Sequence, residues 1–146
     1  MNTTTGRSVQ FKEAGPTDRK TLSGGAPLMN GDAAVKLYVC EVGQVKLLTP
    51  QEETVLIVRI KSGDRKAREG LIKGNLRRVV EISREYEDSG LPLLDLISEG
   101  NMGLMKAVDR FEPINGNNFS AYSTWWIRQS IKRAIANQVK PLLQAA

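Results

Sequence analysis

Residues 92–110 read PLLDLISEGNMGLMKAVDR, and this stretch decides the fold class. Its apolar side chains recur at steps of three and four residues, the spacing of one face of an α-helix. Gly100 and Gly103 lie inside the pattern, at a cost of about 1 kcal/mol each relative to alanine. Glycines in such a position usually permit close packing of another backbone. The pattern therefore predicts a helix with an apolar stripe formed by Leu93, Leu96, Ile97, Leu104, Met105 and Val108.

The N-terminal part of the chain changes character near Asp32. Residues 1–31 are rich in glycine and proline and show little apolar periodicity, which predicts a disordered arm. Asp32 is a favourable N-cap residue. The apolar residues after it predict a short helix that ends at Gly43.

A capping signature marks the next helix. Thr49 has the properties of an N-cap, Pro50 suits the first helical position, and Glu52 stands three residues after the cap. Residues 54–58 read TVLIV and would fit a strand on periodicity alone. The signature before them, together with Gly63 after them, favours a helix.

The rest of the pattern is helical as well. Residues 64–90 predict one long amphipathic helix that closes near Gly90, and residues 112–118 predict a turn. The last helix is predicted from about Ser120 to Gln138, stopping before Pro141. Because no segment favours a strand, we predict an all-α fold: a compact multi-helix bundle preceded by the disordered arm.

The composition excludes several kinds of chemistry. The 146 residues include no histidine and a single cysteine, Cys40. These counts rule out histidine-based acid–base catalysis, an internal disulfide and a thiolate zinc cluster. No apolar run reaches the ~20 residues needed to cross a bilayer. We therefore expect a cytoplasmic protein that is not an enzyme and has no cofactor, metal, membrane or small-molecule partner. The net charge of +5 is a weak indication of an anionic partner.

Aromatic and cationic side chains gather in the last third of the chain. Five of the eight aromatic residues lie between positions 111 and 126, and residues 113–146 contain four Lys or Arg and no Asp or Glu. Such a mixture is typical of a surface that stacks unpaired bases. The alternative is that the rings form core and the cations a solvated face. Because Trp125 and Trp126 point about 100° apart on a helix, both can hardly be buried deeply.

A second candidate face lies on the helix of residues 92–110. Its polar residues follow helical steps and end in a methionine, a composition that suits a partner helix. An ordinary solvated face is the alternative. In the preceding helix, Asn75 interrupts the apolar side and needs a hydrogen-bond partner if it is buried. A core network and a ligand contact both fit Asn75.

Two segments together resemble the primary type of bacterial RNA polymerase sigma factor. They are residues 90–111, GLPLLDLISEGNMGLMKAVDRF, and residues 119–133, FSAYSTWWIRQSIKR. Residues 47–53, LLTPQEE, and residues 75–77, NLR, fit earlier helices of the same family. The resemblance extends from about residue 32 to residue 138. It implies the family's second domain at residues 63–140, a discriminator-proximal helical segment at 32–62 and a short tail at 141–146.

The resemblance implies two partners. One is the clamp coiled coil of core RNA polymerase, which would dock on Asp95, Ser98, Glu99, Asn101 and Met105. The other is promoter DNA, as the non-template single strand of the −10 element. A flipped adenine and the edge of the remaining duplex would meet Phe111, Glu112, Phe119, Tyr122, Trp125, Trp126 and Gln129, with Arg128, Lys132 and Arg133 towards phosphate. A second flipped base would enter a pocket near Asn75, Leu76 and Ser120, and Arg77 would also contact the DNA.

The sequence also departs from the family pattern. Asn115 and Asn117 stand where a basic and an aromatic residue usually help to capture and melt DNA. Ser98, Arg78, Ala121 and Cys40 also replace usual residues. Because family members continue into a −35-reading domain and this sequence diverges after Gln138, we expect only the N-terminal part and the second domain here. The function implied is recognition and melting of the −10 element with core polymerase. The alternative is a truncated sigma-like protein that occupies the clamp without opening promoters.

Overall fold

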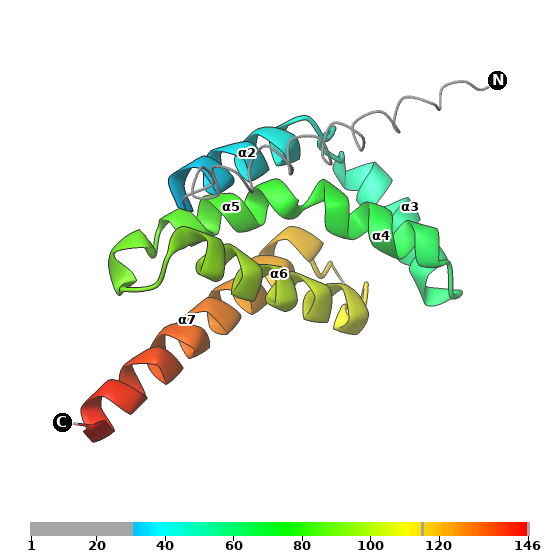
Figure 1. The fold of residues 1–146 in the computed structure, drawn as a ribbon. Coiled ribbons are helices and arrows are strands. Elements are labelled where there is room, and N and C mark those ends of the chain that lie inside the picture. The colour runs from blue at the N-terminus through cyan, green and yellow to red at the C-terminus, as the bar shows by residue number, and fades with distance from the viewer. Residues whose placement is uncertain (1–30, 115, 146) are drawn as a thin grey trace. The chain divides into compact units, whose positions relative to one another are not determined.

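The computed structural model describes residues 31–114 and 116–145, and these residues contain helices and no strand. The all-α prediction is therefore confirmed. The helices are α2 (Gly31–Gly43), α3 (Pro50–Lys61), α4 (Arg65–Gly74), α5 (Leu76–Arg84), the 3-10 turn η2 (Glu87–Ser89), α6 (Leu93–Arg110) and α7 (Phe119–Ala145) (Figure 1). The chain divides into two units, Met1–Leu37 and Tyr38–Ala146. The predicted arm at residues 1–31 falls almost entirely outside the described residues. All contacts below lie within the second unit.

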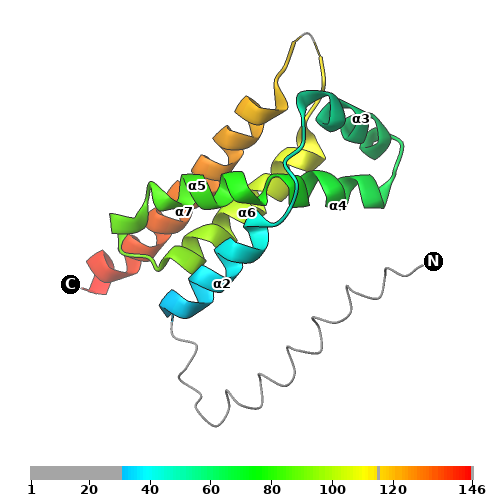
Figure 2. The ribbon, with the colours of Figure 1, turned by 90° about the horizontal axis from the view of Figure 1, so that it is seen from above.

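Helices α6 and α7 form the closest pair in the second unit. They run in opposite directions side by side (Figures 1 and 2). A Cβ atom added to Gly103 would lie 2.5 Å from the backbone oxygen of Trp126 and 2.7 Å from Oγ of Ser130. A Cβ on Gly100 would lie 2.7 Å from Cγ1 of Val79 on α5. The predicted close approach of another backbone is confirmed at Gly103, whereas the neighbours of Gly100 are side chains of α5 and α7.

The core is formed where α5 crosses the α6–α7 pair. Leu96, Leu104, Ile127, Ile131 and Val79 are completely or almost completely buried there. The second half of α2 adds Val42 to the same cluster, and α3 adds Ile57. Burial of an aliphatic side chain of this size stabilises the fold by roughly 1.5–3 kcal/mol. The helical stripe predicted for residues 92–110 is thus the centre of the core, apart from Met105, which is exposed.

Residues 64–90 form two helices and a 3-10 turn, so the prediction of one long helix is wrong. Helices α4 and α5 lie nearly end to end (Figure 2). Between them Asn75 has φ −114° and ψ 6°, outside the helical region. Its side-chain amide donates a hydrogen bond of 2.9 Å to the carbonyl oxygen of Leu71. An asparagine that bonds the backbone in this way competes with the helical ladder, and here it ends α4.

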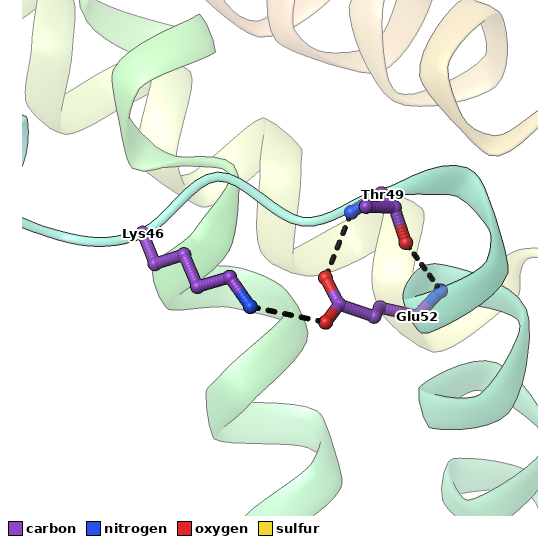
Figure 3. A network of polar contacts seen from close by, with 3 residues as sticks. All are labelled: Lys46, Thr49 and Glu52. Carbon is purple, nitrogen blue, oxygen red and sulfur yellow. Dashed lines mark hydrogen bonds and ion pairs between the residues drawn. The ribbon is translucent and has the colours of Figure 1, made fainter.

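The N-terminus of α3 is closed by the predicted capping box, which is confirmed (Figure 3). The backbone N–H of Glu52 donates to Oγ1 of Thr49 over 3.1 Å, and the N–H of Thr49 donates to Oε1 of Glu52 over 2.9 Å. Lys46 adds an ion pair of 3.2 Å to the other carboxylate oxygen. The hydrogen bond from the Thr49 backbone is the main reason that the pKa of Glu52 is lowered. This box fixes where the connection from α2 enters α3.

Helix α7 is longer than predicted at both ends. It begins at Phe119, because the side chain of Asn118 accepts a hydrogen bond of 3.1 Å from the backbone N–H of Ala121 and so caps the helix. At the other end the helix runs through Pro141 to Ala145. The predicted stop before Pro141 is therefore wrong. A proline removes one backbone hydrogen bond, and a long helix with the remaining bonds intact can continue past it.

The glycine contact between α6 and α7 can be tested by a single methyl group. We expect Gly103→Ala to lower the free energy of unfolding by about 1–3 kcal/mol, because its Cβ would press on the α7 backbone. Gly70→Ala is the matched control: on α4 the added Cβ would lie 3.9 Å from Leu56, an ordinary contact, and alanine favours the helix. Urea unfolding followed by circular dichroism measures both variants. Equal effects of the two substitutions would contradict the close contact.

Candidate nucleic-acid interface

Five aromatic rings form one continuous cluster at the start of α7. The centroid of Phe111 lies 5.3 Å from that of Phe119 and 5.2 Å from that of Tyr122. The series continues from Tyr122 to Trp126 over 6.3 Å and from Trp126 to Trp125 over 5.4 Å. Neighbouring rings are tilted or edge-to-face, a favourable geometry for aromatic pairs. The five rings that gather between positions 111 and 126 of the sequence are therefore connected by ring contacts.

Exposure divides this cluster into a buried and an accessible part. Phe111 and Phe119 are 3% and 5% exposed, so their faces are not open to a base and they support the other rings. Trp126 is partly buried, and the guanidinium carbon of Arg110 lies over the Trp126 ring, 5.2 Å from the ring centroid. Trp125 is 55% exposed. The core alternative therefore holds for the two phenylalanines, and base stacking on the exposed Trp125 stays a prediction.

Trp125 belongs to a strip of exposed or half-buried residues along α7. Arg128, Gln129 and Lys132 follow it at steps of three, four and seven residues, so they share one helical face. Lys132 is exposed, whereas Arg128 is ion-paired with both carboxylate oxygens of Glu85 on the C-cap of α5. We call these four residues the Trp125 strip. An aromatic face flanked by cations can hold a base and its phosphate at the same time.

The ion pair with Glu85 has electrostatic consequences for both partners. The hydrogen bond from Arg128 lowers the pKa of the Glu85 carboxyl. Glu85 and then the hydroxyl of Tyr86 raise the pKa of Arg128. The sequence alone did not single out Glu85, because it lies 43 positions before Arg128 and no periodic pattern connects them.

The loop between α6 and α7 is held by its own polar groups. The carboxylate of Glu112 forms an ion pair of 3.2 Å with Lys61 at the end of α3. Its backbone oxygen accepts a hydrogen bond of 2.9 Å from the side chain of Asn117. Asn117 therefore closes the loop instead of presenting a free side chain. A cavity of about 190 Å³ lies beside the loop and is lined by α3 residues together with Phe111, Pro113, Asn117, Asn118 and Phe119.

Residues of the predicted second base site, near Asn75, make contacts within the chain. Asn75 is 2% exposed and bonds Leu71 and, over 3.4 Å, the carboxylate of Glu53. The Arg77 guanidinium donates hydrogen bonds to the carbonyl oxygens of Gly43 and Val45. These bonds connect the segment after α2 to α5. Leu76 packs against the core, and the backbone oxygen of Ser120 accepts a hydrogen bond from Ser123. The core-network hypothesis for Asn75 fits these contacts.

A second face lies in a groove of about 620 Å³ between α6 and the second half of α7. Asp95, Ser98 and Glu99, which the sequence grouped, line it together. Asn101 and Met105 do not line this groove: the Asn101 amide reaches the Tyr38 hydroxyl over 3.4 Å, and Met105 is exposed. Arg133, predicted with the DNA contacts, lines the groove as well. Sequence reasoning missed Leu91, Met102, Lys106, Ser130, Ala134, Asn137 and Gln138.

The described residues contain neither a candidate metal cluster nor a candidate membrane-spanning helix. None of their acidic and cysteine side chains gather in a group of three or more that could hold a metal. Among the same residues, no helix combines the length and the apolar character that a transmembrane span requires.

Comparison with known proteins agrees with this architecture. Residues 71–140 match the family model described as sigma-70 region 2. The chain is also 52% identical over 111 residues to RNA polymerase sigma factor SigA of Clostridium acetobutylicum. This alignment covers 76% of the chain and 29% of the relative, so the chain spans less than a third of that protein's length. The chain belongs to the sigma-70 family, and its relatedness is to the primary type of sigma factor, as the sequence predicted.

The ion pair of 2.8 Å between Arg68 on α4 and Asp109 on α6 predicts a pH effect on stability. Arg68 lowers the pKa of Asp109 from its ordinary value of 3.8. A lowered folded-state pKa gives stability that is present above the unfolded value and lost as pH falls through the folded value. We therefore expect Asp109→Asn to reduce the loss of unfolding free energy between pH 5 and pH 2, measured by urea titration. Asp88→Asn, an exposed carboxylate on η2, is the control, and an identical acid response of the two variants would refute the prediction.

Proposed function

We propose that this chain acts in transcription initiation as a sigma factor that docks on core RNA polymerase and binds the −10 promoter element. The observation that carries the DNA contact is the exposure of Trp125, 55% in a cluster whose phenylalanines are buried. A tryptophan that is fixed by neighbouring rings and open on one side loses little conformational freedom when a base stacks on it. The similarity to RNA polymerase sigma factor SigA supports the same role.

The division into two faces supports two partners. The Trp125 strip carries an aromatic ring and cations, which suit a single nucleic-acid strand. The α6 side of the groove carries Asp95 and Glu99 beside Met102, a combination of carboxylates and a flexible apolar side chain, with Lys106 further along the helix. This composition suits a basic amphipathic helix of a protein partner, and we assign to it the clamp coiled coil of the polymerase. Asn101 and Met105 would extend that contact beyond the groove.

Capture of the flipped adenine is the finer part of the proposal. Unstacking a base costs a few kcal/mol, and an aromatic surface offsets that cost when it receives the base. Trp126 contacts both Trp125 and Tyr122, and Trp126 and Tyr122 are partly buried, so a base would meet a surface of several rings. Lys132 and Arg128 would hold its phosphates. Melting of the duplex would follow from this capture.

One set of contacts favours a second candidate function. Three groups expected near DNA are engaged within the chain: Glu112 by Lys61, Arg128 by Glu85 and Asn117 by the loop backbone. A surface whose polar groups already have partners within the chain has fewer of them left for DNA. It suits a protein that occupies the polymerase clamp and discriminates poorly between DNA sequences. The two candidates share polymerase docking and differ in DNA binding.

Substitutions on the two faces test the division of labour. We expect Trp125→Ala to weaken binding of the −10 strand to the chain–polymerase complex by about tenfold, because one stacked base is worth ~1–3 kcal/mol. Its affinity for core polymerase should not change. Leu47→Ala, which shortens an equally exposed apolar side chain, is the control. Fluorescence anisotropy of the labelled strand and co-sedimentation with polymerase measure the two affinities.

The opposite result is expected on the groove. Glu99→Lys reverses a charge at the proposed docking face and should weaken polymerase binding by tenfold or more, since like charges at an interface cost several kcal/mol. Glu87→Lys, an exposed carboxylate on η2, is the matched charge reversal. If Trp125→Ala and Glu99→Lys each abolish both affinities while circular dichroism shows a folded protein, the two-face assignment is wrong.

A further inference from the structure

The contact between Glu85 and Arg128 joins two helices at the edge of the Trp125 strip. Glu85 stands at the C-cap of α5, immediately after its last residue, and Arg128 lies on α7. Both guanidinium Nη atoms donate, one to each carboxylate oxygen, and the Nη2–Oε2 distance is 3.3 Å. Two-point pairing of this kind holds the guanidinium in a defined direction.

The position of Arg128 makes this contact relevant to ligand binding. Its neighbours on the same helical face are Trp125, one turn before it, and Lys132, one turn after it. Trp125 and Lys132 are both exposed, whereas the Arg128 side chain is 36% exposed. Among the described residues, Glu85 is the one carboxylate that forms an ion pair with the strip. It removes one of the two positive charges there.

A phosphate and a carboxylate compete for the same guanidinium. Each accepts two parallel hydrogen bonds from the planar fork of an arginine, and the fork faces one acceptor at a time. Because both side chains of the pair are more than a third exposed, the pair is weak enough to be opened by an incoming anion.

We propose that Glu85 is an intramolecular competitor that occupies Arg128 until a phosphate of the bound strand displaces it. Glu85 thereby weakens nucleic-acid binding and makes it less sensitive to salt. The residue determines how tightly the Trp125 strip holds a strand, and it touches no base. This inference rests on the proposed function, since the strand is the one that the strip would bind.

The test replaces the carboxylate by its neutral amide. We expect Glu85→Gln to strengthen binding of the labelled −10 strand to the chain–polymerase complex by about two- to fivefold, the strength of an exposed ion pair. The slope of log K against log salt should become steeper by about 0.7, the value for one phosphate contact on a single strand. Glu81→Gln is the control, because it removes the same charge from an exposed position about one turn earlier on α5.

A second background shows whether the gain passes through Arg128. In a chain that already carries Arg128→Gln, the further change Glu85→Gln should leave affinity within about twofold. A gain that persists in that background, an equal gain in Glu81→Gln, or weaker binding by Glu85→Gln would each overturn the proposal. The last result would mean that the pair positions Arg128 for the strand instead of competing with it.

The failure of this inference is separable from the failure of the proposed function. The same variants are titrated with an unspecific single strand in the absence of polymerase. If the chain fails to bind the −10 strand with polymerase but Glu85→Gln still strengthens unspecific binding through Arg128, the competitor role stands and the sigma function falls. If the chain binds the −10 strand and Glu85→Gln has no effect, the competitor role falls and the function stands.

Discussion

The approach of α7 to Gly103 of α6 determines the geometry on which both faces depend. With no side chain at this position, the backbone at Trp126 and the side chain of Ser130 lie against α6. This contact fixes how α7 is rotated about its own axis. It turns Ile127 and Ile131 into the core and leaves Trp125 on the outside. A methyl group at Gly103 would therefore change which residues of α7 face solvent, besides lowering stability.

The same contact explains why one helix serves two surfaces. Trp125 lies on an exposed side of α7. Arg133, Ala134 and Asn137 lie on the side of α7 that lines the groove with α6. Partners on the two sides would contact a single rigid helix. Ion pairs such as Arg68–Asp109 and Lys61–Glu112 connect α4 and α3 to the other end of α6, where the loop into α7 begins. The site is thus supported by packing at its centre and by exposed charges at its edge.

Local signals in the sequence were sufficient for much of this structure. The capping box at Thr49, the apolar stripe of α6 and the role of its glycines follow from rules that act within a few residues. The break at Asn75 was not predictable in this way, because apolar periodicity continues through it and the cause is a side-chain hydrogen bond to Leu71. The continuation of α7 past Pro141 likewise opposes the usual local preference. For the site, the clustering of rings between positions 111 and 126 indicated the aromatic surface, but burial of Phe111 and the pairing of Arg128 depend on distant helices.

The most direct test of promoter recognition compares two non-template strands, one with the −10 sequence and one with its key adenine replaced. Each labelled strand is titrated with core polymerase, with and without this protein, and binding is followed by fluorescence anisotropy. If the chain recognises promoters, binding requires the protein and falls by about tenfold or more when the adenine is replaced, since a mismatched base typically costs ~1–3 kcal/mol. Equal binding of the two strands, with polymerase docking intact, would contradict promoter recognition and favour a protein that only occupies the clamp.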